Sequence, residues 1–291
     1  MKIIKYFFEF IIIVSLFCIF KIIGLKNASN FGSILGKVIG PFFRSKNIIK
    51  QNIKIGLGNL DKKKEEEIIN GMWSNIGRTF AEYIFLKNFK LSKTGFNHIK
   101  ITGIEYLDQI KKSNKPVVFF SGHFANFELM AMELDKFGVK LAAIYRPLNN
   151  FFLNPLMEYL RMKYICPIQI KKGVSGSREI IKKIKDEYSI ALMVDQRVSE
   201  GPRLSFFNKE AHTTTIPVQI ALKYNCKLVP IYIERKNGIN FEMVIHEPYE
   251  ITKTGVHEDD LKNNSLTINK NIEKMIIKNP TQWIWTHDRW K

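Results

Sequence analysis

A histidine and a glutamate five residues apart are the pair in this sequence best suited to acid–base chemistry. His123 and Glu128 follow the apolar segment PVVFF, which is typical of a buried strand. Two residues five apart on one helix diverge by about 140°, so a contact between them requires the helix to begin after the histidine. Asn126 is a good N-cap for such a helix. We therefore expect His123 to fold back onto Glu128.

This pair predicts a general base. A carboxylate on one imidazole nitrogen fixes the tautomer and stabilises the imidazolium that forms when the other nitrogen accepts a proton. With no Ser or Cys partner, such a pair suits direct deprotonation of a substrate hydroxyl. The spacing alone is weak evidence, because about 0.6 such pairs arise by chance from 6 histidines and 27 acidic residues in 291 positions. The position at a strand end, behind a glycine, strengthens the functional interpretation over that of a core histidine.

Other chemistries have no comparable pattern. The motifs H-E-x-x-H, G-x-S-x-G and G-x-x-x-x-G-K-[ST] are absent, which argues against zinc proteases, ordinary serine hydrolases and P-loop proteins. The remaining histidines show no paired ligand spacing, and the three cysteines are too few and too widely spaced for a disulfide framework or a four-ligand zinc site. We expect no metal and no cofactor.

The elements that must position the pair alternate between strand and helix patterns. This alternation predicts an α/β fold with a mainly parallel central sheet flanked by helices. The expected strands are PVVFF, LAAIY, SIALMV, KLVPIYIE and FEMVIHE. The expected helices cover residues 47–88, 127–137, 153–163, 178–185, 217–224 and 263–278. With no repeat and no linker, residues 26–291 are expected to form one domain.

Residues 1–25 predict an N-terminal membrane-anchor helix. The apolar segment 3–25 would span about 34 Å as a helix, enough for a hydrocarbon core of about 30 Å, although Lys5, Glu9 and Lys21 weaken it as a span. The nearest signal-peptide cleavage site, around Ala28, is poor, and we favour an uncleaved anchor over the two alternatives of a signal peptide and an apolar helix packed on the body. The segment 31–43 is too short and glycine-rich to span and is expected to lie at the membrane interface.

Charge places the body of the protein on the cytoplasmic side of a membrane. Lys2 and Lys5 precede the uninterrupted apolar stretch 10–20, and six basic residues follow the segment 3–25 within thirty positions: Lys26, Lys37, Arg44, Lys46, Lys50 and Lys54. Over the whole chain 45 Lys and Arg face 27 Asp and Glu, a net charge of +18. Such an excess predicts anionic partners.

Several further motifs occur in a fixed order along the chain. They are NIGRTFAEY with Glu82, SGHFANFE with His123 and Glu128, YRPLNN, Arg161, KKG at 171–173, VDQ with Asp195, a loop with Phe206 and Phe207, and the ending NPTQWIWTHDRWK. From about residue 52 to 291 the sequence thereby resembles the late acyltransferases of lipid A biosynthesis, the lauroyl/myristoyl acyltransferase family, within the wider H-x-x-x-x-[DE] acyltransferases. Phe151 departs from the pattern, which favours Pro after the two asparagines.

The resemblance implies a single glycerolipid-acyltransferase-like domain in the bacterial inner membrane. Its expected activity is transfer of a fatty acyl group from acyl carrier protein to a hydroxyl group of an anionic lipid A precursor, without a covalent acyl-enzyme. His123 would be the general base, oriented by Glu128. Arg161 would stabilise the oxyanion or bind a substrate phosphate. Arg146 and Asp195, at strand ends, would position the substrate, and Phe206 and Phe207 would line the acyl groove.

Three alternatives remain open from the sequence. An acyltransferase for another glycolipid or phospholipid, using acyl-CoA, would have the same pair. A membrane-tethered nucleic-acid-binding protein would explain the charge, but basic residues interleaved with exposed aromatics are not visible, so no nucleic acid is expected. An inactive scaffold is the third alternative. The intact set of His123, Glu128, Arg161 and Asp195 argues against it.

Overall fold

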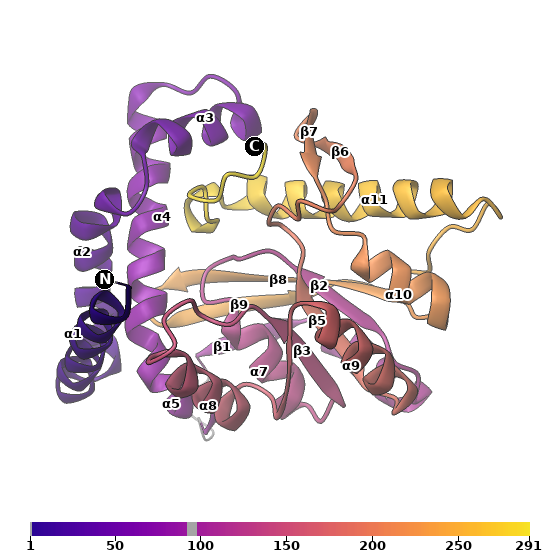
Figure 1. Ribbon diagram of the computed structural model, residues 1–291, viewed down its shortest axis with the longest axis horizontal. Helices are drawn as coiled ribbons and strands as arrows, with labels where there is room; N and C mark the ends of the chain where they lie inside the picture. Colours follow the sequence, from indigo (N-terminus) through magenta and orange to yellow (C-terminus); the bar gives the residue numbers. More distant parts are fainter. Residues whose placement is uncertain (1, 92–97) are drawn as a thin grey trace.

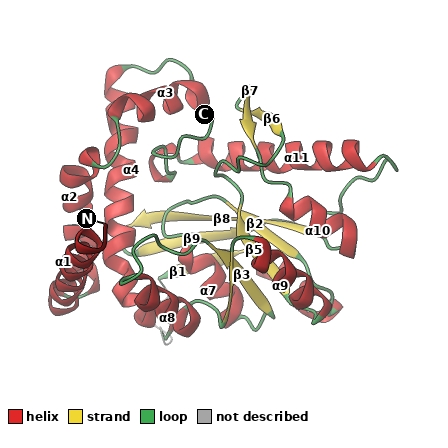
Figure 2. Ribbon diagram, viewed as in Figure 1, coloured by secondary structure: helices red, strands yellow, loops and turns green. Residues whose placement is uncertain are grey.

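The order of the strands brings distant parts of the chain together at one edge of a sheet. The structure is a computed structural model that describes residues 2–91 and 98–291. The described residues form a seven-stranded sheet in the order β1-β9-β8-β2-β5-β3-β4 (Figures 1 and 2). The strands are β1 Ile99–Thr102, β2 Val118–Ser121, β3 Leu141–Tyr145, β4 Ile168–Lys171, β5 Ser189–Met193, β8 Leu228–Asn237 and β9 Asn240–Ile245. Only the β8–β9 pair is antiparallel among these neighbours.

Helices cover the sheet on both sides. Figure 1 shows α11 above the sheet and α7 and α8 below it. The helices of the body are α3 Lys46–Leu57, α4 Lys62–Glu82, α5 Leu86–Lys90, α6 Ile104–Ser113, α7 Glu128–Lys136, α8 Asn154–Tyr164, α9 Val174–Lys185, α10 Ile216–Tyr224 and α11 His257–Lys278. A separate hairpin, β6 Arg203–Phe206 with β7 Lys209–His212, lies beside α11. The predicted α/β fold with a mainly parallel sheet is confirmed.

The strands with the strongest apolar patterns in the sequence are found where they were predicted. Strands β2, β3, β5, β8 and β9 lie where expected, and all four residues of β2 are buried at the centre of the sheet. Residues 47–88, predicted to be helical, are helical over most of their length but are divided into α3, α4, the 3-10 helix Tyr83–Phe85 and the start of α5. Gly58 ends α3 with φ +77°, and Asp61 then caps α4 by accepting a hydrogen bond from Lys64 N at 2.8 Å. The short elements β1, α6, β4 and the β6–β7 hairpin were not predicted.

The N-terminal part of the chain forms a helical layer at the edge of the body. Helix α1 (Lys2–Ile23) is followed by α2 (Leu25–Ile39) and the short 3-10 helix η1 (Gly40–Phe42), and this layer packs on α4 (Figure 2). By length and composition α1 could cross a membrane. The glycines of α2 face α4, because a Cβ on Gly36 would lie 2.1 Å from Trp73 O and one on Gly32 2.4 Å from Gly77 O. The helices thus approach closely through small residues, which leaves the large apolar side chains of α2 on the outside.

Candidate active site

The register of two neighbouring strands sets His123 level with Asp195. Strands β2 and β5 are parallel, with Ser121 paired to Met193. His123 and Asp195 each follow two residues after this last pair. The carboxyl ends of parallel strands meet at one edge, where ligands of open α/β sheets bind. The fold therefore brings together two residues that are 72 positions apart.

Asp195, and not Glu128, is the hydrogen-bond partner of the His123 ring. Nδ1 of His123 lies 2.8 Å from Asp195 Oδ1. The other oxygen, Oδ2, accepts hydrogen bonds from His123 N at 2.9 Å and from Trp283 Nε1 at 2.8 Å. The expectation that Glu128 orients His123 is corrected, because the strand order supplies a carboxylate from β5. Asp195, expected among the substrate-positioning groups, lies behind the histidine.

Electrostatics support an ionised aspartate beside an imidazole whose pKa is raised. Burial would lower the pKa of His123, but the charge of Asp195 and its hydrogen bond outweigh burial and raise this pKa above its ordinary value of 6.5. Burial would raise the pKa of Asp195, but the charge and hydrogen bonds of His123, with the bond from Trp283, lower it to about 2. A carboxylate can only accept, so Nδ1 carries the proton and Nε2 has the free lone pair. Within residues 2–91 and 98–291, no hydrogen bond reaches Nε2.

Glu128 instead holds Arg161 beside the histidine. Its Oε1 accepts hydrogen bonds from Arg161 Nε at 3.0 Å, from Arg161 Nη2 at 2.5 Å and from Tyr83 Oη at 3.3 Å. The Arg161 guanidinium also lies 5.4 Å from the centre of the Tyr145 ring. Burial would lower the pKa of Arg161, but the charge of Glu128 dominates and raises it, so the side chain stays cationic. Arg161 is therefore a fixed positive charge in the wall of the same cavity that His123 lines.

The loop between His123 and Glu128 is held by hydrogen bonds from two distant segments. Ala125 has φ +44°, and its carbonyl accepts hydrogen bonds from Asn75 Nδ2 and Thr79 Oγ1, each at 3.1 Å. Its N–H donates to Gln282 O at 3.1 Å. Asn126 was expected to cap the following helix. Its side chain donates instead to Glu82 Oε2 at 3.0 Å, and α7 begins at Glu128 without a side-chain cap.

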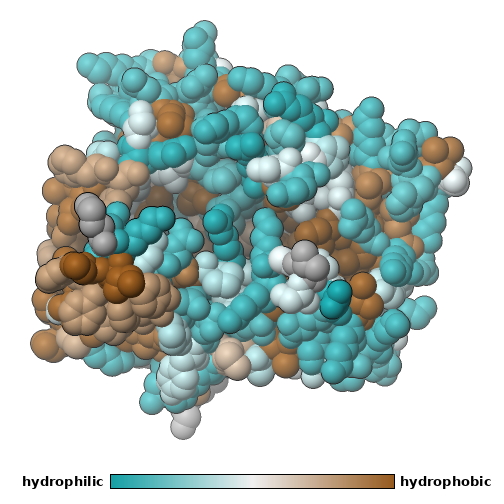
Figure 3. All heavy atoms as spheres, in the orientation of Figure 1, coloured by the Kyte–Doolittle hydropathy of each residue, from teal (hydrophilic) through white to brown (hydrophobic). Residues whose placement is uncertain are grey.

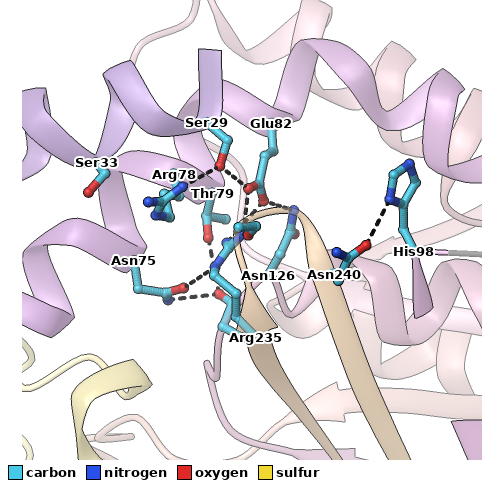
Figure 4. Close-up of polar contacts among 12 residues, drawn as sticks. Ser29, Ser33, Asn75, Arg78, Thr79, Glu82, His98, Asn126, Arg235 and Asn240 are labelled. Carbon is cyan, nitrogen blue, oxygen red and sulfur yellow. Dashed lines mark hydrogen bonds and ion pairs between the residues drawn. The ribbon is translucent and has the colours of Figure 1, made fainter. Parts of the chain in front are cut away.

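A buried ion pair lies beneath this loop (Figure 4). Glu82 on α4 receives Arg235 Nη1 at 2.5 Å and Nη2 at 3.0 Å, and both side chains are buried. Ser29 on α2 donates to the same carboxylate at 2.7 Å. Arg235 Nε also donates to Asn75 Oδ1 at 3.2 Å. The network joins the N-terminal layer, α4 and β8 to the loop that carries the histidine.

A cavity of about 440 Å³ opens beside His123, within the usual range of about 300–1,000 Å³ for ligand sites. Its lining is largely apolar and includes Phe119, Phe120, Met130, Leu134, Ile144, Ile165 and Leu192. Its polar lining includes His123, Glu128, Arg161, Arg146, Lys172, Arg197 and His287. Four of the predicted site residues, His123, Glu128, Arg146 and Arg161, thus line one cavity, with Asp195 directly behind His123. Phe206 and Phe207 do not line it. Phe206 is buried against Trp290, with ring centres 5.6 Å apart.

A second histidine in this cavity is held neutral. Burial lowers the pKa of His287 to about 4. Its Nε2 accepts a hydrogen bond from Arg197 N at 2.8 Å, so its ring orders the backbone beyond Asp195. Among the described residues, no group of three His, Cys, Asp or Glu side chains is arranged to hold a metal ion.

Sequence reasoning missed three residues that complete the site. Trp283 binds Asp195, Tyr83 binds Glu128, and Arg235 binds Glu82. The motifs around residues 82 and 283 marked two of these segments, but the spacing of a motif does not tell which side chain will reach another strand. Arg235 carried no signal, since it follows an apolar strand pattern as one more basic residue.

Comparison with known proteins identifies the family to which this chain belongs. The family model described as bacterial lipid A biosynthesis acyltransferase matches residues 1–291. The lipid A biosynthesis lauroyltransferase of Escherichia coli (strain K12) is 23% identical over 269 residues, which cover 89% of this chain and 84% of the relative. The lipid A biosynthesis acyltransferase of Haemophilus influenzae is 24% identical over 257 residues, covering 84% and 76% of the two chains. This chain therefore belongs to the bacterial lipid A biosynthesis acyltransferase family, and it is an acyltransferase of that type.

Proposed function

We propose that this protein transfers a fatty acyl group from acyl carrier protein to a hydroxyl group of a lipid A precursor, at the cytoplasmic face of the bacterial inner membrane. The observation that carries the proposal is the His123–Asp195 pair, with Nδ1 bound to a carboxylate and Nε2 open beside an apolar cavity. Membership of the family supports lipid A as the class of acceptor.

The proposed reaction is a direct transfer. His123 Nε2 accepts the proton of the acceptor hydroxyl while the hydroxyl oxygen attacks the thioester carbonyl carbon. A C–O bond forms, and the carbonyl oxygen becomes an oxyanion. When this intermediate collapses the C–S bond breaks, and the imidazolium returns the proton to the leaving sulfur. Asp195 stabilises the imidazolium by its charge throughout. Because the acceptor hydroxyl attacks the thioester directly, no acyl group is bound covalently to the enzyme.

Arg161 is the proposed stabiliser of the oxyanion. Its charge is permanent, and Glu128 and Tyr83 fix its position at the cavity before substrate binds. A preorganised charge of this kind stabilises the transition state more than it stabilises the neutral thioester. Glu128 then acts as a positioning residue through Arg161. Arg146, with Lys172 and Arg197, would bind phosphate on the acceptor or on the prosthetic group of the carrier protein.

The net charge of +18 suits the proposed partners. Acyl carrier protein, a phosphorylated acceptor and the inner leaflet of the membrane are all anionic, so the same field attracts each of them. Helix α1 would hold the enzyme at the membrane in which the acceptor is dissolved.

The test is the mass of lipid A from cells that lack a late acyltransferase of their own. We expect wild-type protein to add the mass of one acyl group, and His123→Ala to add none at equal protein level. His257→Ala, at an exposed position outside the cavity, is the matched control and should act as wild type. A His123→Ala variant with near wild-type transfer would refute the proposed base.

Rates of acyl transfer by purified enzyme distinguish between the candidate donors and between the candidate acceptors. We expect faster transfer from acyl carrier protein than from acyl-CoA, and transfer to a lipid A precursor but not to phosphatidylglycerol or another glycolipid. If the enzyme prefers acyl-CoA or a different lipid, and its His123→Ala variant is inactive, the proposed substrates are wrong but the proposed base is retained.

A further inference from the structure

Helix α1 packs along the body of the protein over most of its length. Near its C-terminal end Phe17 and Phe20 are buried, with ring centres 5.2 and 6.1 Å from that of Phe80 on α4. Phe10, Ile13 and Leu16 also pack against the core. The helix is therefore part of the domain surface and not a projecting stalk.

The N-terminal half of α1 contacts the loop of residues 146–153, which we term the rim loop because its first four residues line the cavity. Asn150 Nδ2 donates to Tyr6 O at 2.9 Å and to Glu9 Oε2 at 3.2 Å. The Phe152 ring lies 5.7 Å from that of Phe7 and 6.2 Å from that of Phe10.

Asn150 also shapes the rim loop itself. Its Oδ1 accepts hydrogen bonds from Phe152 N at 3.1 Å and from Leu153 N at 3.2 Å, where the loop turns into α8. The side chain is buried. A single residue thus links the cavity wall to the N-terminal helix. Glu9, which weakens α1 as an apolar span, provides a polar partner for this link.

The opposite face of the helical layer is apolar and exposed. On α1 it includes Ile4, Phe8, Ile12, Ile19 and Ile22, and it continues through Ile34 and Val38 of α2 to Phe42 and Phe43. Figure 3 shows apolar surface gathered over α1 and α2 on the left of the view. Residues 2–57 carry nine Lys and Arg residues and one acidic residue, Glu9. An apolar face bordered by lysines matches an anionic phospholipid surface.

We propose that α1 lies in the plane of the membrane surface, with this exposed face in the lipid, and that the Glu9–Asn150 contact couples the embedded helix to the rim of the cavity. A spanning α1 is incompatible with its packing. Contacts with the body occur from Tyr6 to Phe20, about 21 Å along the helix axis. A span would carry the rim loop, with the exposed Arg146 and Asn149, into the hydrocarbon or beyond it. The cavity therefore opens at the lipid surface.

Cysteine labelling in membranes tests the orientation without reference to activity. In full-length protein with Cys18→Ser, single variants Lys2→Cys and Lys26→Cys place a thiol at each end of α1. The native Cys166 and Cys226 are buried. With a membrane-impermeant maleimide applied to inside-out vesicles and to spheroplasts, we expect both positions to label from the same, cytoplasmic side. Labelling of the two positions from opposite sides overturns the proposal, whatever reaction the enzyme catalyses.

Substitutions at Glu9 test the coupling, and this arm rests on the proposed function. Glu9→Leu makes α1 more apolar but removes the side-chain acceptor that α1 offers to Asn150, leaving only Tyr6 O, whereas Glu9→Gln keeps an acceptor oxygen. We expect Glu9→Leu to bind vesicles of phosphatidylglycerol and phosphatidylethanolamine at least as tightly as wild type, and to transfer acyl groups to a membrane-embedded acceptor roughly 3- to 10-fold more slowly.

Controls separate coupling from general damage. Glu9→Gln should be close to wild type, as should Lys5→Gln, which removes the exposed ion-pair partner 3.8 Å from Glu9 Oε1 and leaves the Asn150 contact to Oε2 in place. Asn150→Ala should reduce the rate as Glu9→Leu does, and the double variant should be no slower than Asn150→Ala alone. Full activity of Glu9→Leu, or additive losses in the double variant, would overturn the coupling. If wild type transfers no acyl group at all, the proposed function fails, while the labelling result still stands.

Discussion

Asp195→Asn is the substitution that most sharply tests the structure of the site. Asp195 Oδ2 accepts from two fixed donors, His123 N at 2.9 Å and Trp283 Nε1 at 2.8 Å. An amide NH₂ in that position would face two N–H groups, so the asparagine must turn its oxygen toward them. Its NH₂ then faces His123 Nδ1, which must become an acceptor. The proton moves to Nε2, and the histidine can no longer accept a proton from the substrate.

The expected loss follows from this change of tautomer. The same substitution in a Ser-His-Asp triad lowers kcat about 10⁴-fold, and we expect kcat/KM to fall about 10³- to 10⁴-fold, or roughly 4–5.5 kcal/mol in the activation barrier. Glu128→Gln serves as the comparison, because Glu128 contacts Arg161 and not the ring. Its loss should be about 10- to 100-fold, the size expected when a charged partner of Arg161 becomes neutral.

The pH dependence gives an independent readout. Because Asp195 raises the pKa of His123, wild-type kcat/KM should rise with pH through a value above 6.5. Without the aspartate charge, burial dominates and lowers the pKa of His123. The acid limb of the residual activity of Asp195→Asn should therefore shift to lower pH. Initial rates of acyl transfer between pH 5.5 and 9 measure both effects, with thermal unfolding as the check on folding. A larger loss for Glu128→Gln than for Asp195→Asn would refute the assignment of Asp195 as the partner of the base.

Three further substitutions test the frame around the site. Trp283→Phe keeps a ring but removes one donor to Asp195, and kcat/KM should fall about 10-fold without a downward shift of the acid limb. Gly77→Val places a Cβ 2.0 Å from Gly32 O, and thermal unfolding should show a loss of about 3 kcal/mol, whereas Lys37→Ala on the outer face of α2 should change little. Arg235→Met leaves Glu82 buried without its cation and should cost about 3–5 kcal/mol of unfolding free energy, part of which Glu82→Gln in the same chain should restore.

The sequence predicted the parts of the molecule that depend on local pattern. Continuous apolar segments predicted the central strands, and the position of His123 after PVVFF predicted its place at the edge of the sheet. The partner of that histidine could not be predicted, because it depends on β5 lying between β2 and β3. Strand order is a property of long-range packing, and no local spacing encodes it. Glu128 was the nearest carboxylate in sequence, but the nearest in space to the ring nitrogen is Asp195.

The link between Trp283 and Asp195 has a consequence for synthesis of the protein in the cell. Helix α1 emerges from the ribosome before the body of the protein, and residue 283 follows 260 positions after residue 23. At a translation rate of about 5–20 residues per second, that interval is roughly 13–52 s. With α1 placed at the lipid surface as we propose, the nascent chain can reach that surface well before Asp195 gains its hydrogen bond from Trp283. On the proposed mechanism, synthesis itself delays acylation until residue 283 has been made, so a translation product interrupted before that residue would lack the last donor to Asp195.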